Sequence, residues 1–115
     1  MKLTQKNIKQ YLEANPLGTK VAVGSIQEMN NDDYIILNYL YERLIGSDNR
    51  GIYSTAVQFT IATKDFDNRK KLVDYIKQQF NVSVDYEMSN EYQYYMATCD
   101  TTIILVKDEE VGQIV

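Results

Sequence analysis

Residues that could carry out catalysis are few in this chain. The sequence contains no histidine, which is the commonest general base and metal ligand in proteins. Two neighbouring carboxylates, Asp65 and Asp67, could act as an acid–base pair. They precede a predicted helix, however, and the first amide groups of a helix also attract carboxylates. We therefore interpret Asp65 and Asp67 as helix-capping residues.

Other possible ligand-binding residues also have simpler structural interpretations. Asp32 and Asp33 could help to bind a cation, but a calcium loop needs ligands at several alternating positions and a final glutamate. Cys99 lies in a predicted strand without a nearby basic cluster, which favours a small core residue over a reactive thiol. The five glycines are too scattered to form a phosphate-binding loop. The sequence thus predicts a protein that is not an enzyme and that has no metal site and no cofactor.

Length and composition indicate one folded domain. The chain has 115 residues, of which 44% are hydrophobic and 24% charged, and this suits a single core. Its net charge is −4, and no stretch combines basic with aromatic residues, so we expect no specific nucleic-acid binding. We find no signal peptide and no long apolar run, and the single cysteine cannot form an internal disulfide. We therefore expect a reducing, aqueous compartment and no membrane partner.

Residues 52–80 organise the predicted fold. Within residues 52–63, alternate side chains lie on one face of a strand: Tyr53, Thr55, Val57, Phe59, Ile61 and Thr63. Over residues 69–80, the apolar residues Leu72, Val73, Ile76 and Phe80 recur at helical spacing, and Asn81 can end the helix. A strand with one apolar face and a helix with one apolar stripe cover each other, so this unit supplies the core of a two-layer domain.

The preceding residues predict a helix and a short strand. Thr4 can cap a helix over residues 5–14, which ends before Pro16 because the residue before a proline is pushed out of the helical region. Residues 19–26 then alternate as a short strand that can bulge at Gly24. The first helix is expected to dock at the edge of the domain.

Residues 34–45 are apolar at nearly every position, so a helix and a strand compete as interpretations. We prefer a strand because the run is rich in tyrosine and isoleucine and because the turn cluster at 46–51 leads into the strand at 52–63. The two strands would pair as a long hairpin. A strand of this length spans about 40 Å, twice the usual length, so its distal half should overhang the body.

An overhanging ribbon rich in tyrosine is expected to bind a partner. The chain has ten tyrosines, whose apolar rings and polar tips suit both strand surfaces and protein interfaces. The candidate subunit or partner interface comprises Tyr39, Tyr41, Arg43, Asp48, Asn49, Arg50 and Tyr53.

The C-terminal part predicts a second hairpin. Residues 82–88 alternate as a strand, and residues 92–106 form its partner, with a bulge near Asp100 where the alternation slips. The acidic residues 107–115 have no periodicity and are predicted to be a flexible tail. The predicted class is α+β over a single domain of residues 1–106. It has a mainly antiparallel β-sheet with a long hairpin, packed against one long helix, plus an N-terminal helix.

This order of elements resembles that of the tail terminator and tail-completion proteins of long-tailed phages. The likeness covers residues 4–106 and centres on the strand at 57–64, which directly precedes a helix, as in members of that group. Members often enter the first long strand through a Pro-Tyr step, where this chain has Asp33 and Tyr34.

The resemblance implies a role in assembling a virion. It implies a homo-oligomer, a hexameric ring that can be monomeric in solution, which caps the tail tube and joins it to the head. The implied partners are the tail tube protein and a head-completion or connector protein. The implied location is the head–tail junction of the virion, and the host cytoplasm during assembly.

Other interpretations stay open on the sequence alone. A head–tail connector, acting as stopper or adaptor, is similar in size and partly in fold. A small acidic binding module, such as an immunity or inhibitor protein, would fit the negative charge and the many tyrosines. An enzyme that uses Asp65, Asp67 or Cys99 is the third hypothesis.

Overall fold

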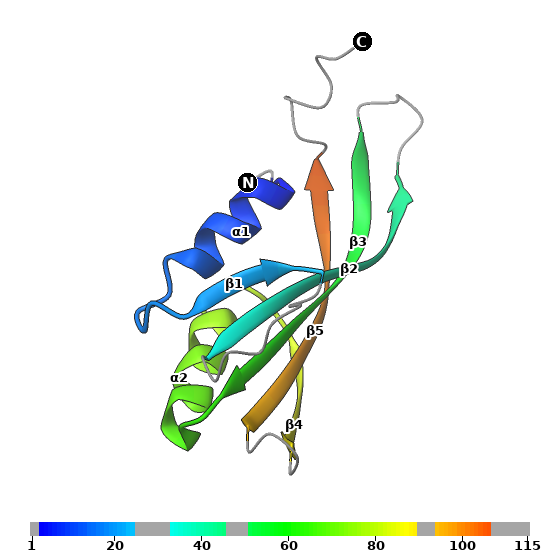
Figure 1. Ribbon diagram of the computed structural model, residues 1–115. Coiled ribbons are helices and arrows are strands. Elements are labelled where there is room, and N and C mark those ends of the chain that lie inside the picture. The colour runs from blue at the N-terminus through cyan, green and yellow to red at the C-terminus, as the bar shows by residue number, and fades with distance from the viewer. Residues whose placement is uncertain (1–2, 25–32, 46–50, 90–93, 107–115) are drawn as a thin grey trace.

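A mixed sheet of five strands, in the order β1-β2-β3-β5-β4, forms the frame of the domain (Figure 1). The computed structural model describes residues 3–24, 33–45, 51–89 and 94–106. The elements follow one another as α1 (Gln5–Glu13), β1 (Lys20–Val23), β2 (Tyr34–Leu44), β3 (Ile52–Thr63), α2 (Phe66–Lys77), β4 (Ser83–Ser89) and β5 (Tyr94–Val106). The predicted α+β class is confirmed.

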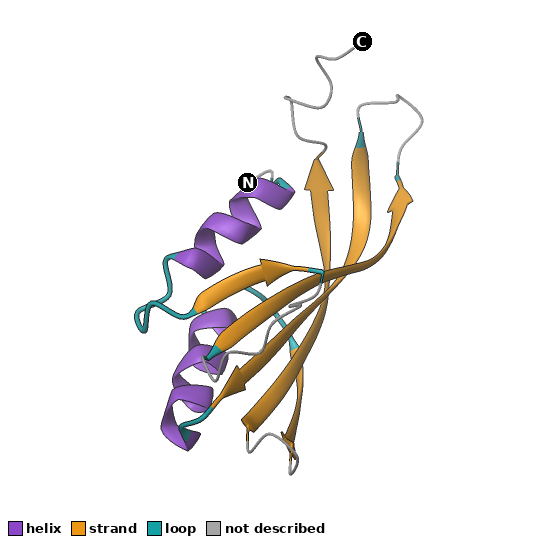
Figure 2. Ribbon diagram, viewed as in Figure 1, coloured by secondary structure: helices purple, strands orange, loops and turns teal. Residues whose placement is uncertain are grey.

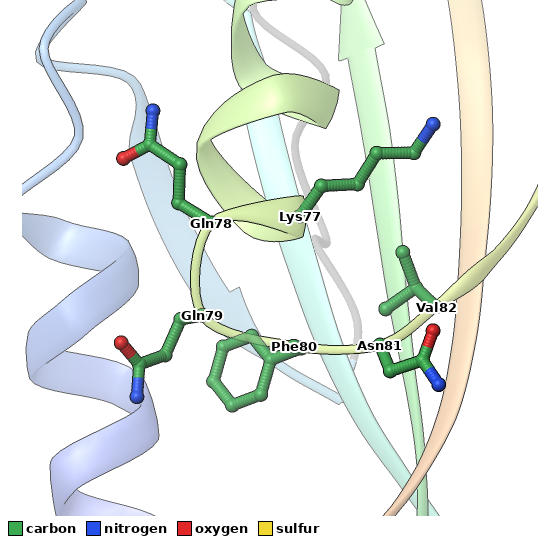
Figure 3. A pocket seen from close by; sticks show the side chains of 6 residues that line it. All are labelled: Lys77, Gln78, Gln79, Phe80, Asn81 and Val82. Atoms are coloured by element: carbon green, nitrogen blue, oxygen red, sulfur yellow. The ribbon is translucent and has the colours of Figure 1, made fainter.

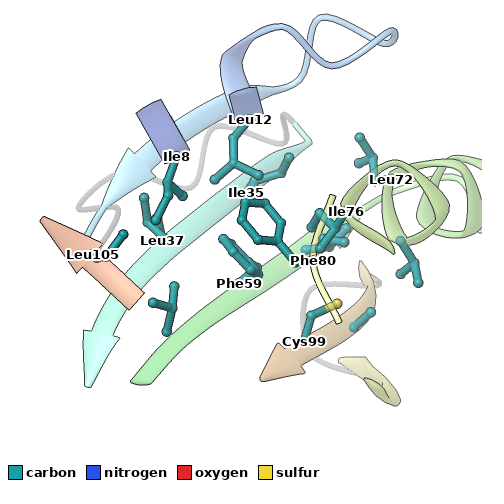
Figure 4. Close-up of a cluster of buried hydrophobic side chains, with 14 residues drawn as sticks. Ile8, Leu12, Ile35, Leu37, Phe59, Leu72, Ile76, Phe80, Cys99 and Leu105 are labelled. Atoms are coloured by element: carbon teal, nitrogen blue, oxygen red, sulfur yellow. The ribbon is translucent and has the colours of Figure 1, made fainter. Parts of the chain in front are cut away.

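Both helices lie on the same side of the sheet (Figure 2). We call this side of the sheet the covered face and the other side the uncovered face. Leu12 of α1, Ile76 of α2 and Phe59 of β3 belong to one buried cluster between these layers (Figure 4). The rings of Phe59 and Phe80 lie 5.2 Å apart in its centre. The core therefore joins both helices to the middle strand, as the pattern in residues 52–80 predicts.

The strand β3 has the bounds and the apolar face that its alternation predicts. Thr55, Val57, Phe59, Ile61 and Thr63 are all buried on the covered face. β3 pairs with β2 on one side and, along its whole length, with β5 on the other. This central position explains why nearly all its covered-face side chains are inaccessible to water.

Both helices begin at the capping residues that the sequence indicates. The hydroxyl of Thr4 accepts a hydrogen bond from the amide of Asn7, and the Asn7 side chain accepts one from the amide of Thr4, forming a capping box. The Asp65 carboxylate accepts hydrogen bonds from the amides of Asp67 and Asn68 at 2.8 and 3.2 Å. Asp65 thus starts α2.

The bounds of α2 differ from the predicted range of residues 69–80. The helix starts at Phe66, directly after its cap, and ends at Lys77. Phe80 lies beyond it, yet its side chain is buried and its amide donates to the carbonyl of Ile76. The apolar spacing overstated the helix because a buried side chain in the following turn continues the same stripe.

Two tyrosines join the helices to each other. The rings of Tyr11 and Tyr75 are stacked, with centroids 4.4 Å apart and an interplanar angle of 10°. The hydroxyl of Tyr11 donates to the carbonyl of Tyr75 at 2.6 Å, and the hydroxyl of Tyr75 donates to the carbonyl of Tyr11 at 2.6 Å. These reciprocal bonds hold α1 against α2. The sequence predicts only that α1 docks at the edge of the domain.

The pairing of β1 departs from the antiparallel pattern. β1 runs parallel to β2, with Lys20 opposite Tyr34 and Val23 opposite Leu37. It ends before the predicted limit, because Gly24 adopts a positive φ of 90° while its amide donates to the carbonyl of Leu37. The sheet is therefore mixed, although its other pairings are antiparallel.

The predicted bulge near Asp100 is wrong. β5 pairs without interruption with β3 and β4 through this residue, and the Asp100 carboxylate accepts a hydrogen bond from Gln58 at 3.1 Å. The alternation slips because Tyr94 and Met96 contribute to a small apolar cluster separate from the main core. The register shift lies instead in β2, between Tyr39 and Tyr41.

Several predictions concern residues outside the described ranges. These are most of the turn cluster at 46–51, the possible cation ligand Asp32, and the tail at 107–115. They stay predictions.

Truncation of Ile76 tests the packing between α2 and the sheet. We expect Ile76→Ala to lower the free energy of unfolding by about 2–5 kcal/mol, because the cavity would lie in a fully buried cluster. Urea denaturation measures this difference, and Lys70→Ala on the exposed side of the same helix should change it by less than about 0.5 kcal/mol. An Ile76→Ala protein as stable as the parent would contradict the packing.

The tyrosine pair makes a second prediction. Tyr11→Phe and Tyr75→Phe keep the stacked rings but each remove one hydroxyl, so each should lower the free energy of unfolding by about 0.5–1.5 kcal/mol. Burial raises the pKa of both hydroxyls above the ordinary 10.0. Their stabilisation is therefore present below pH 10 and is lost as the pH rises through the higher folded-state pKa.

Urea denaturation at pH 7 and at pH 11 measures both effects. Tyr41→Phe is the matched control, because its ring is exposed. A difference between the parent and the two variants that does not shrink at pH 11 would contradict this account of the hydroxyls.

Candidate subunit interface

The distal halves of three strands extend beyond α2, beside the N-terminal end of α1, and form what we call the arm. The arm comprises residues 40–44 of β2, 52–56 of β3 and 101–106 of β5 (Figure 1). β1 pairs with β2 only as far as Leu37, and β4 pairs with β5 only from Tyr94 to Asp100. The domain measures 48 × 26 × 24 Å as a result. The predicted overhang is present, but it is three-stranded, because β5 continues beside the hairpin.

We call the β2 side of the arm the arm edge (residues 40–44). No strand of the described part of the chain pairs with it beyond Leu37. Leu40, Tyr41 and Leu44 on this edge are 55%, 68% and 47% exposed. An edge that combines open backbone groups with apolar side chains favours pairing with another chain. The opposite side of the arm differs, since Leu3 forms a bridge with Leu105 there.

Tyr39, a predicted interface residue, is half-buried and lies against the main core. Its side chain packs against the main core, and its hydroxyl lies 3.4 Å from the carbonyl of Gln5, to which it donates. Burial raises the pKa of Tyr39 to about 12. The register shift between Tyr39 and Tyr41 divides β2 into two halves. Tyr39 ends the half that packs against the main core, and Tyr41 lies in the half that belongs to the arm.

The other predicted interface residues divide in two. Tyr41 and Arg43 are exposed on the arm edge, and Tyr53 is half-buried in the neighbouring strand. Asp48, Asn49 and Arg50 lie outside the described residues. Sequence reasoning missed Leu40, Leu44 and Ile104, which are exposed on the arm. Their one signal in the sequence was their position in the distal part of long predicted strands.

A second exposed aromatic surface lies around Arg69 at the start of α2. Its guanidinium lies over the rings of Phe66, Tyr86 and Tyr95, at 4.9, 4.8 and 5.7 Å. It also donates to the carbonyls of Glu87 and Met96, at 3.3 Å each. Arg69 thus ties α2 to β4 and β5.

The outer edge of β4 likewise has no partner strand among the described residues, since β4 comes last in the strand order. Tyr86 and Met88 on this strand are 53% and 50% exposed. The sequence showed their alternation but gave no sign that Arg69 would cover the same strand.

Two hollows on the described surface are lined by few ionisable side chains. One, of about 420 Å³, follows the turn after α2 and is lined by Lys77, Gln78, Gln79, Phe80, Asn81 and Val82 (Figure 3). The side chains of Lys77, Gln78 and Gln79 point away from one another there. A second hollow of about 490 Å³ lies at the base of the arm, between Leu40 and Asp100.

The described residues that could have carried out catalysis or bound a metal ion are engaged in the structure of the domain. Asp33 accepts a hydrogen bond from the amide of Lys64 at 2.8 Å, and Asp65 caps α2. Cys99 is buried in the main core, and burial raises the pKa of its thiol to about 11. Among the described residues, no three His, Cys, Asp or Glu side chains gather in a way that could hold a metal ion. No helix in the same part of the chain is long and apolar enough to cross a membrane.

No protein-family model matches this sequence, and no curated protein is significantly similar to it. Fold and surface therefore define the class: an α+β domain whose long sheet ends in an exposed arm. Its candidate site is an interface rather than a pocket.

Replacing Tyr39 or Tyr41 by serine, on either side of the register shift in β2, tests which of the two tyrosines contributes to the core. Tyr39→Ser should lower the free energy of unfolding by about 1–3 kcal/mol, because it removes a ring that packs on the core. Tyr41→Ser should change it by less than about 1 kcal/mol, because the Tyr41 ring is exposed. Urea denaturation of both variants measures this contrast, and equal losses would place both tyrosines in the same environment.

Proposed function

We propose that this protein is a virion assembly protein of a long-tailed phage or prophage. In this role it is a tail terminator or tail-completion protein, which forms a ring that caps the tail tube and joins it to the head. The observation that carries the proposal is the arm edge, whose open backbone and exposed Leu40, Tyr41 and Leu44 need a partner.

A ring of identical subunits suits this surface. In a cyclic assembly each subunit contributes two different patches, and closure leaves none of them exposed. The arm places its edge at one end of the 48 Å long axis, away from α2. A neighbouring copy can therefore approach the arm without disturbing the core. The order of elements, which resembles that of tail terminators, supplies the particular role.

The titratable residues support a structural role rather than catalysis. Asp65 caps α2, Asp100 accepts a hydrogen bond from Gln58, and the Cys99 thiol is buried. Each of these groups has a structural function or environment that explains its place. The proposal accordingly assigns no reaction and no cofactor to the protein.

Tail length in a phage that lacks this protein tests the role. We expect tails longer than normal, because nothing would stop growth of the tube, and normal length when the wild-type protein is supplied. Leu40→Asp combined with Leu44→Asp should fail to restore normal length, because the charges would lie on the arm edge. Val23→Asp, which changes another half-exposed strand residue, is the matched control and should restore it. Electron microscopy of tails measures the length.

Two outcomes would change the assignment. Tails of normal length that fail to join heads would assign the protein to the head–tail connectors instead. Normal tails on normal, infectious particles would refute the proposed function altogether.

A further inference from the structure

Two of the sheet edges that no described strand pairs with differ in charge. One is the arm edge, with Glu42 and Arg43; the other is the outer edge of β4, with Asp85 and Glu87. We propose that in the assembled ring the arm edge of one copy pairs with the β4 edge of the next copy. This inference rests on the proposed function, and it names the two surfaces that meet.

The two charges of the arm edge point to opposite faces of the sheet. Arg43 lies opposite Ser54, which is on the uncovered face, whereas Glu42 lies opposite Thr55, which is buried on the covered face. Residues directly opposite each other in a sheet share a face. The arm edge therefore presents a positive charge on one face and a negative charge on the other.

The β4 edge presents the reverse arrangement. Asp85 and Glu87 lie opposite Thr98 and Met96, on the uncovered face. On the covered face, the guanidinium of Arg69 lies 4.8 Å from the ring of Tyr86. The β4 edge is thus negative on the face where the arm edge is positive, and positive where the arm edge is negative.

The apolar residues match in the same way. Leu44 lies opposite Tyr53 and so belongs to the covered face, and Tyr86 and Met88 lie opposite Ala97 and Tyr95 on that face. All three side chains are about half exposed in the single chain. When the two edges pair antiparallel, the covered faces of both copies lie on the same side, so these side chains come together.

Pairing of like edges does not give this match. Two arm edges paired antiparallel about a two-fold axis keep their faces aligned and bring Arg43 beside Arg43 or Tyr41 rather than beside Glu42, because Glu42 and Arg43 are on different faces. Two β4 edges would bring Asp85 and Glu87 of one copy against the same carboxylates of the other. Like charges directly opposite one another destabilise a strand pair. The charges therefore favour a head-to-tail contact over a two-fold dimer.

The positions of the two edges suit a ring. β2 and β4 lie on opposite sides of the five-stranded sheet, and the arm and β4 lie toward opposite ends of the molecule. A contact between two different patches repeats from copy to copy and closes when the rotation permits. The arm edge and the β4 edge thus supply the two patches that each ring subunit needs.

Paired charge reversals test this contact. One variant carries Arg43→Glu, and the other carries Asp85→Arg with Glu87→Arg. Each variant alone places like charges at every contact between copies. Because like charges across an interface weaken binding, each variant should need an at least tenfold higher concentration than the wild type to assemble. An equimolar mixture should assemble like the wild type, because each reversed edge then meets its complement.

Sedimentation over a concentration series in low salt measures assembly, and thermal melting confirms that each variant is folded. The second readout is normal tail length after both variants, or one alone, are supplied to a phage that lacks the protein. Lys71→Glu, the same charge change on the exposed side of α2, is the control and should behave like the wild type.

The outcomes separate this inference from the proposed function. Assembly and normal tails only when both variants are present would support the contact. Variants that assemble alone like the wild type, or a mixture that stays as impaired as its components, would overturn it, while wild-type rings and normal tails would leave the proposed function standing. Normal tails without the protein would refute the function, and the contact with it.

Discussion

The length of the sheet relative to its helices governs this structure. β3 has 12 residues, which span about 40 Å, whereas the 12 residues of α2 span about 18 Å. α1 is shorter still. The two helices follow one another along the sheet (Figure 1), so each of them covers only part of the length of the strands. The main core around Phe59 and Ile76 continues to Ile8 of α1 and Leu105 of the arm, whereas the β2 side of the arm is exposed.

Short neighbouring strands also leave the arm edge without a described partner. A short β1 protects β2 only up to Leu37, and β4 protects β5 only up to Asp100. Beyond Asp100, Leu3 forms a bridge with Leu105 of β5. No described strand pairs with β2 beyond Leu37, so its outward backbone groups there are left to water or to another chain, and the exposed apolar side chains beside them favour another chain. Within the body, by contrast, Arg69 and the Tyr11–Tyr75 pair tie the helices to the sheet and to each other. The protein thus combines a packed core with an arm edge that has no partner strand among the described residues.

Tyrosine has several roles here, and residue type alone does not separate them. Tyr11 and Tyr75 join two helices, Tyr39 packs on the core, and Tyr41 is exposed on the arm. Each ring carries both an apolar surface and a hydroxyl, so the same side chain serves in a core, in a contact between helices and at a free edge. A sequence rich in tyrosine therefore indicates strands and contacts without locating the interface.

Local signals in the sequence determined the caps at Thr4 and Asp65, the alternation of β3 and the strand character of residues 34–44, because these depend on neighbouring residues. The tertiary structure alone decided the parallel pairing of β1, the register shift after Tyr39 and the third strand of the arm. It also decided that the arm edge and the β4 edge carry opposite charges on each face. These features depend on which distant strands become neighbours and in which register. Alternation within a single strand separates its two faces but does not say which face the helices cover or which strand lies beside it.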